Sequence, residues 1–69
     1  MPPNPQLLKT PADILQAALA KEKEAFAFYA EGERAAKITM VRDLLTTLKD
    51  EEQRHIRLIE EMLARLRLG

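Results

Sequence analysis

The chain has 69 residues and no cysteine, and its eleven basic and eleven acidic side chains are interleaved to a formal net charge of zero. One small domain is the most that this length allows, and such a domain usually needs a metal or a partner chain when disulfides are absent. The absence of a basic block argues against nucleic-acid binding. The lack of a leader pattern and of a long apolar run argues against a membrane span and predicts a cytoplasmic protein, with a protein compartment inside the cell as the other location considered.

Residues 1–9 are expected to form a flexible tail, because Pro2, Pro3 and Pro5 interrupt regular backbone hydrogen bonding. Leu7 and Leu8 are the apolar exceptions in this tail. They either pack on a neighbouring helix or fray with the rest of it. The domain proper is expected over residues 10–69.

A first helix is predicted over residues 11–36, a stretch rich in Ala, Leu, Glu and Lys. Thr10 suits the N-cap, Pro11 the first helical position, and Asp13 the positive end of the helix. Gly32 is the weak point of this helix. It either permits the close approach of another helix or marks a loosening end.

A second helix is predicted over residues 40–68, with Thr39 as its N-cap and Asp43 in its first turn. A short connection makes the two helices antiparallel neighbours, so we expect an all-α, antiparallel two-helix hairpin. Ion pairs four residues apart are expected on its exposed faces, namely Glu33/Lys37, Asp50/Arg54 and Glu61/Arg65.

Each helix carries a mostly apolar row at alternating spacings of four and three. The first row is Leu15, Leu19, Glu22, Phe26, Tyr29, Glu33 and Ala36, and the second is Val41, Leu45, Leu48, Glu52, His55, Ile59, Met62 and Leu66. In an antiparallel hairpin, residues at equal height have numbers that sum to about 75–77. Glu22 is therefore expected level with a point between Glu52 and His55.

Glu52 and His55 stand three residues apart, so both side chains lie on one helix face within reach of a common ion. A buried charge is costly unless it is paired or bound to a metal, and Glu22 adds a carboxylate at the same height. Two hairpins packed together would offer four carboxylates and two imidazoles, the ligand set of a carboxylate-bridged dinuclear site. Such ligands suit iron, manganese or zinc. The alternative is a coiled-coil hairpin in which polar residues only fix register and oligomeric state.

Three further residues flank this cluster. Glu51 is placed at its rim, where it either supports the ligands or lies on an ion's path to them. Glu33 lies about 16 Å along the helix from Glu22 and is expected to cap or to face solvent near the connection. Tyr29 either acts beside the ligands, by hydrogen-bonding a ligand carboxylate or by supplying an electron, or is a core aromatic with its hydroxyl at the edge. Phe26, Phe28, Met40 and Met62 are interpreted as packing residues.

The stretch from Glu22 to Tyr29, followed by the Glu-x-x-His of Glu52 and His55, resembles the first half of a rubrerythrin-type ferritin-like protein. The interval of 30 residues from Glu22 to Glu52 also resembles the encapsulated ferritins, which are half-length two-helix chains with a di-iron site across a subunit interface. Glu22, Tyr29, Glu52 and His55 match that family's site positions. The resemblance implies oxidation of Fe(II) by oxygen or peroxide at a site of two iron ions per dimer.

The chain departs from rubrerythrins in having no cysteines for a rubredoxin domain, so an external electron donor is expected. It also has two helices where a full ferritin-like chain has four. The resemblance therefore implies a homodimer or higher homo-oligomer that forms a four-helix bundle. Two rival functions stay open: a non-catalytic helical dimerisation module, and a metal-binding structural or storage protein without redox turnover.

Overall fold

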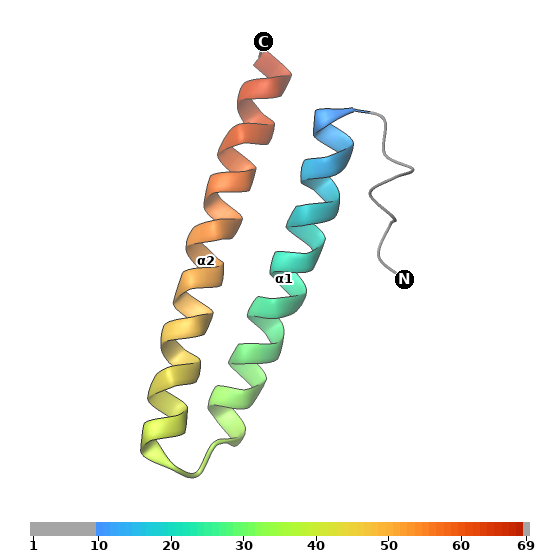
Figure 1. The fold of residues 1–69 in the computed structure, drawn as a ribbon. Helices are drawn as coiled ribbons and strands as arrows, with labels where there is room; N and C mark the ends of the chain where they lie inside the picture. The colour runs from blue at the N-terminus through green and yellow to red at the C-terminus, as the bar shows by residue number, and fades with distance from the viewer. Residues whose placement is uncertain (1–9, 69) are drawn as a thin grey trace.

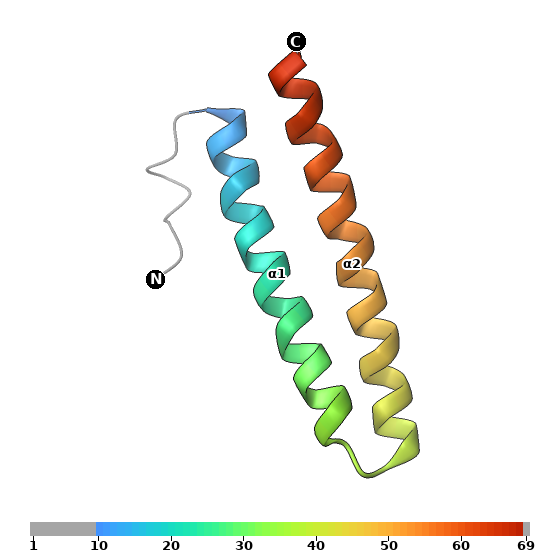
Figure 2. The ribbon, with the colours of Figure 1, turned by 180° about the vertical axis from the view of Figure 1, so that it is seen from behind.

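The computed structural model describes residues 10–68, with side chains through residue 67, and these residues form a hairpin of two long helices (Figures 1 and 2). Helix α1 spans Pro11–Ala35 and helix α2 spans Thr39–Leu68. The two helices pack side by side and antiparallel, and the described residues contain no strand. This all-α hairpin is the predicted fold, with helix ends within one residue of those expected. The expected tail, with Leu7 and Leu8, lies outside the described residues.

The start of α1 is capped as predicted. The Asp13 amide donates to Thr10 Oγ1 over 3.0 Å, Thr10 has extended backbone angles, and Pro11 follows at the first helical position. At the other end, Ala36 turns the chain out of the helix with φ of −68° and ψ of 129°. Its amide donates to the Gly32 carbonyl over 2.9 Å and closes the last turn.

The start of α2 differs from the prediction. The Arg42 amide donates to the Ile38 carbonyl over 3.0 Å, so Ile38 occupies the cap position and Thr39 is already helical. No acidic residue lies in the first turn, and the expectation for Asp43 was wrong. The Arg42 guanidinium instead donates to the Ala36 carbonyl over 2.9 Å, which ties the connection to the helix that follows it.

Gly32 lies where α1 meets α2 closely. A Cβ added at Gly32 would stand 3.2 Å from Leu45 Cδ1, which is tighter than an ordinary van der Waals contact. Of the two interpretations left open for this glycine, the structure supports the close approach of a second helix. That second helix belongs to the same hairpin.

Glu33 joins the two helices, so its expected capping or solvent-facing role was wrong. Its carboxylate accepts hydrogen bonds from Lys49 Nζ at 2.9 Å and from the Thr46 hydroxyl, and its side chain is only 23% exposed. The Thr46 hydrogen bond, followed by that of Lys49, lowers the pKa of Glu33 below its ordinary value. Glu33 belongs to the row that faces α2, and for this reason it bonds to Lys49 rather than to Lys37.

The other two expected pairs, Asp50/Arg54 and Glu61/Arg65, are absent from the ion pairs found among residues 10–67, and their side chains face solvent. Neither helix combines the length and the hydropathy that crossing a lipid bilayer requires.

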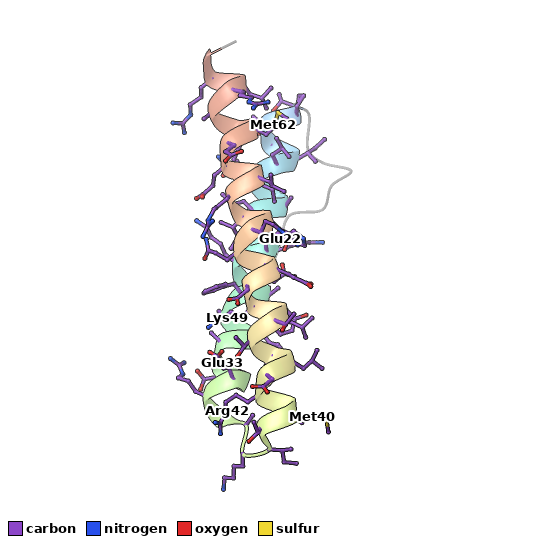
Figure 3. The ribbon with its side chains drawn as sticks, turned by 90° about the vertical axis from the view of Figure 1, so that its left-hand side faces the viewer. Glu22, Glu33, Met40, Arg42, Lys49 and Met62 are labelled. Atoms are coloured by element: carbon purple, nitrogen blue, oxygen red, sulfur yellow. The ribbon has the colours of Figure 1, made fainter. Side chains whose placement is uncertain are left out.

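The hairpin has little core of its own. Among the described residues only Ala17, Leu19 and Ile56 are buried hydrophobic residues, and no side chain there is fully buried. Phe28 is 70% exposed and Met40 is 79% exposed, so the expectation that these two residues pack within the chain was wrong. Figure 3 views the hairpin edge-on and shows Met40 and Met62 toward one side, with Glu33 and Lys49 toward the other. A substantial apolar surface of the hairpin is therefore left uncovered.

Candidate metal centre

Glu22, Glu52 and His55 come together halfway along the hairpin, at the common height that their numbers predicted. His55 Nδ1 lies 3.5 Å from Glu22 Oε2 and 3.7 Å from Glu52 Oε2. One ligand atom from each of the three side chains lies within 4.8 Å of the other two. Helix α1 supplies one carboxylate from its middle (Figure 3), and α2 supplies the other two groups from adjacent turns.

These separations are too long for good hydrogen bonds and suit a shared ion instead. Ligand atoms that each lie about 2.1 Å from one tetrahedral ion are about 3.4 Å from one another. The distances of 3.5 and 3.7 Å from His55 Nδ1 are close to that value. The three side chains could therefore share one ion after small movements of the side chains.

The carboxylate of Glu52 is the most informative group in this cluster. Its side chain is 17% exposed, and its Oε2 atom is buried without any hydrogen-bond partner. A buried carboxylate oxygen that lacks a donor costs about 1–3 kcal/mol or more, because it loses its hydration without replacement. A cation bound between Glu52, Glu22 and His55 would supply the missing partner. The donor set of carboxylates and imidazole therefore fits a first-row divalent metal.

The cluster is open on one side. The His55 side chain is 45% exposed and that of Glu22 is 29% exposed, against 17% for Glu52. The described residues of one hairpin offer three ligands, and they do not enclose an ion.

Glu51 stands beside the cluster without joining it. It is exposed and lines a shallow hollow with Thr47, Asp50 and Arg54, on the outer surface of α2. The structure thus places Glu52, rather than Glu51, beside Glu22 and His55. The interpretation of Glu51 as a rim residue stays a prediction.

Tyr29 is half-buried, and its ring stands edge-on to that of Phe28 with centroids 5.7 Å apart and an interplanar angle of 74°. Among the described residues its hydroxyl makes no hydrogen bond to Glu22, Glu52 or His55. Its expected bond to a ligand carboxylate is not present in a single hairpin and stays a prediction.

Sequence reasoning missed the contact of Lys49 and Thr46 with Glu33. Height matching places Glu33 level with residues 42–44, two or more residues before Thr46 and five or more before Lys49, so it carried no clear signal for this contact. The contact lies nearer the connection than the metal-ligand cluster does. It helps to set the height at which the two halves of that cluster meet.

An antiparallel hairpin with a glutamate on one helix and Glu-x-x-His on the other has the layout of half a ferritin-like bundle. The family model of Rubrerythrin matches residues 13–69, which is most of the chain. The chain therefore belongs to the rubrerythrin family, and its described residues form two helices. The comparison with curated proteins and the comparison with solved structures gave no match.

Proposed function

We propose that two copies of the hairpin pair into a four-helix bundle and hold two metal ions between them. Each copy would contribute Glu22, Glu52 and His55. The single observation that carries this proposal is the buried Oε2 atom of Glu52, which lacks a hydrogen-bond donor and lies beside two other potential ligands. Membership of the rubrerythrin family supports it independently.

The need for two copies follows from the ligand count and from the open side of the cluster. One hairpin offers two carboxylates and one imidazole, and two hairpins offer the four carboxylates and two imidazoles of a dinuclear bundle site. A second hairpin would also exclude water from the exposed side of His55. Burial strengthens the attraction between carboxylates and a cation, because it lowers the local dielectric.

The three side chains would have distinct roles. Glu52, the most buried, would bridge or chelate, Glu22 would chelate or bridge from the opposite helix, and His55 would bind through Nδ1, which faces both carboxylates. Without metal, four clustered carboxylates repel one another, so binding should stabilise the pair of hairpins. Iron is the expected metal, with manganese or zinc as substitutes.

Bound iron would supply one-electron redox chemistry, in which Fe(II) becomes Fe(III) and oxygen or peroxide accepts the electrons. The chain's own residues would hold the Fe(II) substrate and balance its charge. Because the sequence has no cysteine, any turnover that must reduce the iron again would draw electrons from an external donor.

Native mass spectrometry of the chain loaded with Fe(II) under anaerobic conditions tests the site. We expect two iron ions per two chains in the wild type and loss of this species in Glu22→Gln. The matched control is Glu24→Gln, a change of the same chemistry at an exposed position two residues along α1, which should bind as the wild type does. Equal iron binding by Glu22→Gln and Glu24→Gln would refute the proposed site.

A second measurement separates the ferroxidase from its rivals. Oxygen consumption after Fe(II) is added to the protein should exceed that of buffer and should fall in His55→Ala. Stoichiometric binding without oxygen consumption would identify a structural or storage site. Dimers that bind no metal would identify a non-catalytic dimerisation module.

A further inference from the structure

A second row of residues runs along each helix, beside the row that packs on the other helix, and we name these the outer rows. The outer row of α1 is Ile14, Ala18, Lys21, Ala25, Phe28 and Gly32, and that of α2 is Leu44, Leu48, Glu51, His55, Leu58 and Met62. Spacings of four and three place the members of each row on one face of their helix. Five large apolar members are 44–70% exposed, namely Ile14, Phe28, Leu44, Leu58 and Met62.

Both outer rows lie on the same flat side of the hairpin, because the helices are right-handed and antiparallel. Met40 and Leu66 extend the row of α2 by four residues at either end, and they are 79% and 42% exposed. Met40 and Met62 mark this side in Figure 3. Because His55 belongs to the outer row of α2, the exposed side of the metal-ligand cluster faces the same way.

Each outer row has the same spacings when it is read backwards, so it can pair with an inverted copy of itself. The row of α1 is centred on position 23 and pairs Ile14 with Gly32, Ala18 with Phe28, and Lys21 with Ala25. The row of α2 is centred on position 53 and pairs Leu44 with Met62, Leu48 with Leu58, and Glu51 with His55, and its extension pairs Met40 with Leu66. Long side chains of α1 thus meet small ones, and those of α2 meet apolar partners except at the central pair.

The centres of the two outer rows lie at one height. Gly32 and Leu45 lie close together across the hairpin and their numbers sum to 77, whereas the centres at positions 23 and 53 sum to 76. This difference of one residue is about 1.5 Å along a helix. One two-fold axis perpendicular to both helices therefore serves both rows at once. Glu22 and Glu52 lie one residue from these centres, so the axis also brings the ligands of two copies to one height.

Two hairpins that meet through this face have a second symmetric arrangement, in which the axis runs along the helices. That axis would set α1 of one copy antiparallel on α2 of the other. Glu51 would then face an alanine, and Lys21 would stand beside the metal ligand His55. Leu66 would meet the polar start of α1. The perpendicular axis instead sets the carboxylate of Glu51 against an imidazole and covers Leu66 with Met40, so complementary chemistry favours it.

His55 has a second ring nitrogen that the metal-ligand cluster does not use. Only its Nδ1 atom lies within ion-pair distance of Glu22 and Glu52, at 3.5 and 3.7 Å. Among residues 10–67 no hydrogen bond of His55 Nε2 is found, and no ion pair joins this ring to Glu51 of its own chain. An imidazole that binds a metal through one nitrogen almost always donates its other N–H to a carboxylate, a carbonyl or water. Because the His55 side chain is 45% exposed, a second copy has room to supply that acceptor.

We propose that a second copy docks on this face about the perpendicular axis, and that Glu51 of each copy accepts a hydrogen bond from His55 Nε2 of the other. This inference rests on the proposed two-copy site. It adds the orientation of the copies and a residue that each copy contributes to the other's site. Glu51 is a positioning residue, since it acts through the imidazole. It holds the ring with Nδ1 toward the metal and makes that nitrogen a stronger ligand.

Complementation between two variants tests whether Glu51 acts across the interface. The chain has a single histidine, so NMR of the imidazole N–H in the Zn(II) complex reads this contact alone. The wild type should show a slowly exchanging Nε2–H signal, and isotope-labelled Glu51→Ala should lack it. Unlabelled His55→Ala added to labelled Glu51→Ala should restore the signal, because the heterodimer sets the labelled His55 against Glu51 of the other chain. A mixture that fails to restore it, or a wild type that stays monomeric, refutes the contact.

Zinc affinity tests the positioning role. Glu51→Ala should bind Zn(II) about 10–100-fold more weakly than the wild type, which is the usual effect of removing the hydrogen-bond partner of a ligand histidine. Glu51→Gln keeps an acceptor oxygen in a side chain of the same shape, so it should recover most of the lost affinity. The matched control is Asp50→Ala, which removes the neighbouring exposed carboxylate outside the outer row and should bind as the wild type does. Equal affinity in Glu51→Ala and Asp50→Ala overturns the role.

Cysteine cross-linking tests the orientation of the copies, since the chain has no native cysteine. A mixture of the single variants Leu44→Cys and Met62→Cys should be joined efficiently by a short bifunctional thiol reagent. Each variant alone should not be joined, because the axis sets its two copies of the cysteine 18 residues, or about 27 Å, apart. Preferential cross-linking of Ile14→Cys with Met62→Cys would establish the axis along the helices and overturn the proposal.

The count of bound metal ions separates this inference from the proposed function. Wild-type dimers that show the Nε2–H signal and the expected cross-link but bind no iron would leave the contact standing and refute the metal site. Dimers that bind two irons equally well in the wild type and in Glu51→Ala would refute the contact and leave the metal site standing.

Discussion

Replacement of Glu52 by Gln should make the metal-free protein more stable and deprive it of its response to metal. The change keeps the shape of the side chain and removes the charge of a carboxylate whose Oε2 is buried without a donor. It also removes the repulsion between Glu52 and Glu22, whose ligand oxygens lie within 4.8 Å of each other. An amide at this position can instead donate a hydrogen bond to Glu22.

The magnitude follows from two contributions. Two like charges at this separation repel by about 1 kcal/mol in bulk water and about 3 kcal/mol at an effective dielectric near 20. The buried Oε2 that lacks a donor costs the wild type about 1–3 kcal/mol, and Glu52→Gln relieves only part of this cost because the amide is also polar. We expect a net gain of about 2 kcal/mol, which for a domain of this size raises the melting midpoint by about 10 °C.

The assay is thermal unfolding followed by circular dichroism at one fixed chain concentration, with a chelator and with Zn(II) or anaerobic Fe(II). Metal at about 100 times its dissociation constant should stabilise the wild type by about 2.7 kcal/mol and should leave Glu52→Gln nearly unchanged. Glu61→Gln is the control, because it removes an exposed carboxylate from the same helix. A metal-free Glu52→Gln that melts below the wild type, and is still stabilised by metal, would refute the reasoning.

Three further predictions concern the hairpin itself. Because hydrogen bonds lower the pKa of Glu33 in the folded state, its contribution to stability is present above the unfolded value of 4.5 and is lost as pH falls through the folded pKa. Urea midpoints should therefore drop less between pH 7 and pH 3 in Glu33→Gln than in the wild type. Gly32→Ala gains about 1 kcal/mol of helix propensity and loses a similar amount against Leu45, so its urea midpoint should hardly move, whereas Gly32→Leu should lose about 1–3 kcal/mol. Thr10→Ala should cost about 0.5–2 kcal/mol and speed amide exchange at Asp13, and Thr10→Ser should restore both.

The helices and the height of the metal-ligand cluster were predictable because both follow from local rules. Helical periodicity places Glu52 and His55 on one face, and a short connection sets which residue of the opposite helix is level with them. The cap at Thr10 was predictable for the same reason, since a capping side chain acts on backbone groups two or three residues away.

The cross-helix contact of Glu33 was harder to predict, because it depends on how far each helix is rotated about its own axis. Lys37 and Lys49 are both within plausible reach of Glu33 in the sequence, and only the packed structure selects Lys49. The exposure of Phe28 has a different cause. An apolar side chain indicates that something covers it, and the sequence of one chain does not say whether that cover is the same chain or another copy.

The first turn of α1 and the last turn of α2 lie at the same end of the hairpin, opposite the connection between the helices (Figure 1). A four-helix bundle in which the second copy is inverted has the start of that copy's α1 at its far end. A single-chain version would therefore need a linker that runs the length of α2, about 45 Å for its 30 residues, or at least about 14 extended residues. In such a fusion the two hairpins could carry different sequences. One metal position could then be altered while the other is kept, which no point mutation in the symmetric pair allows.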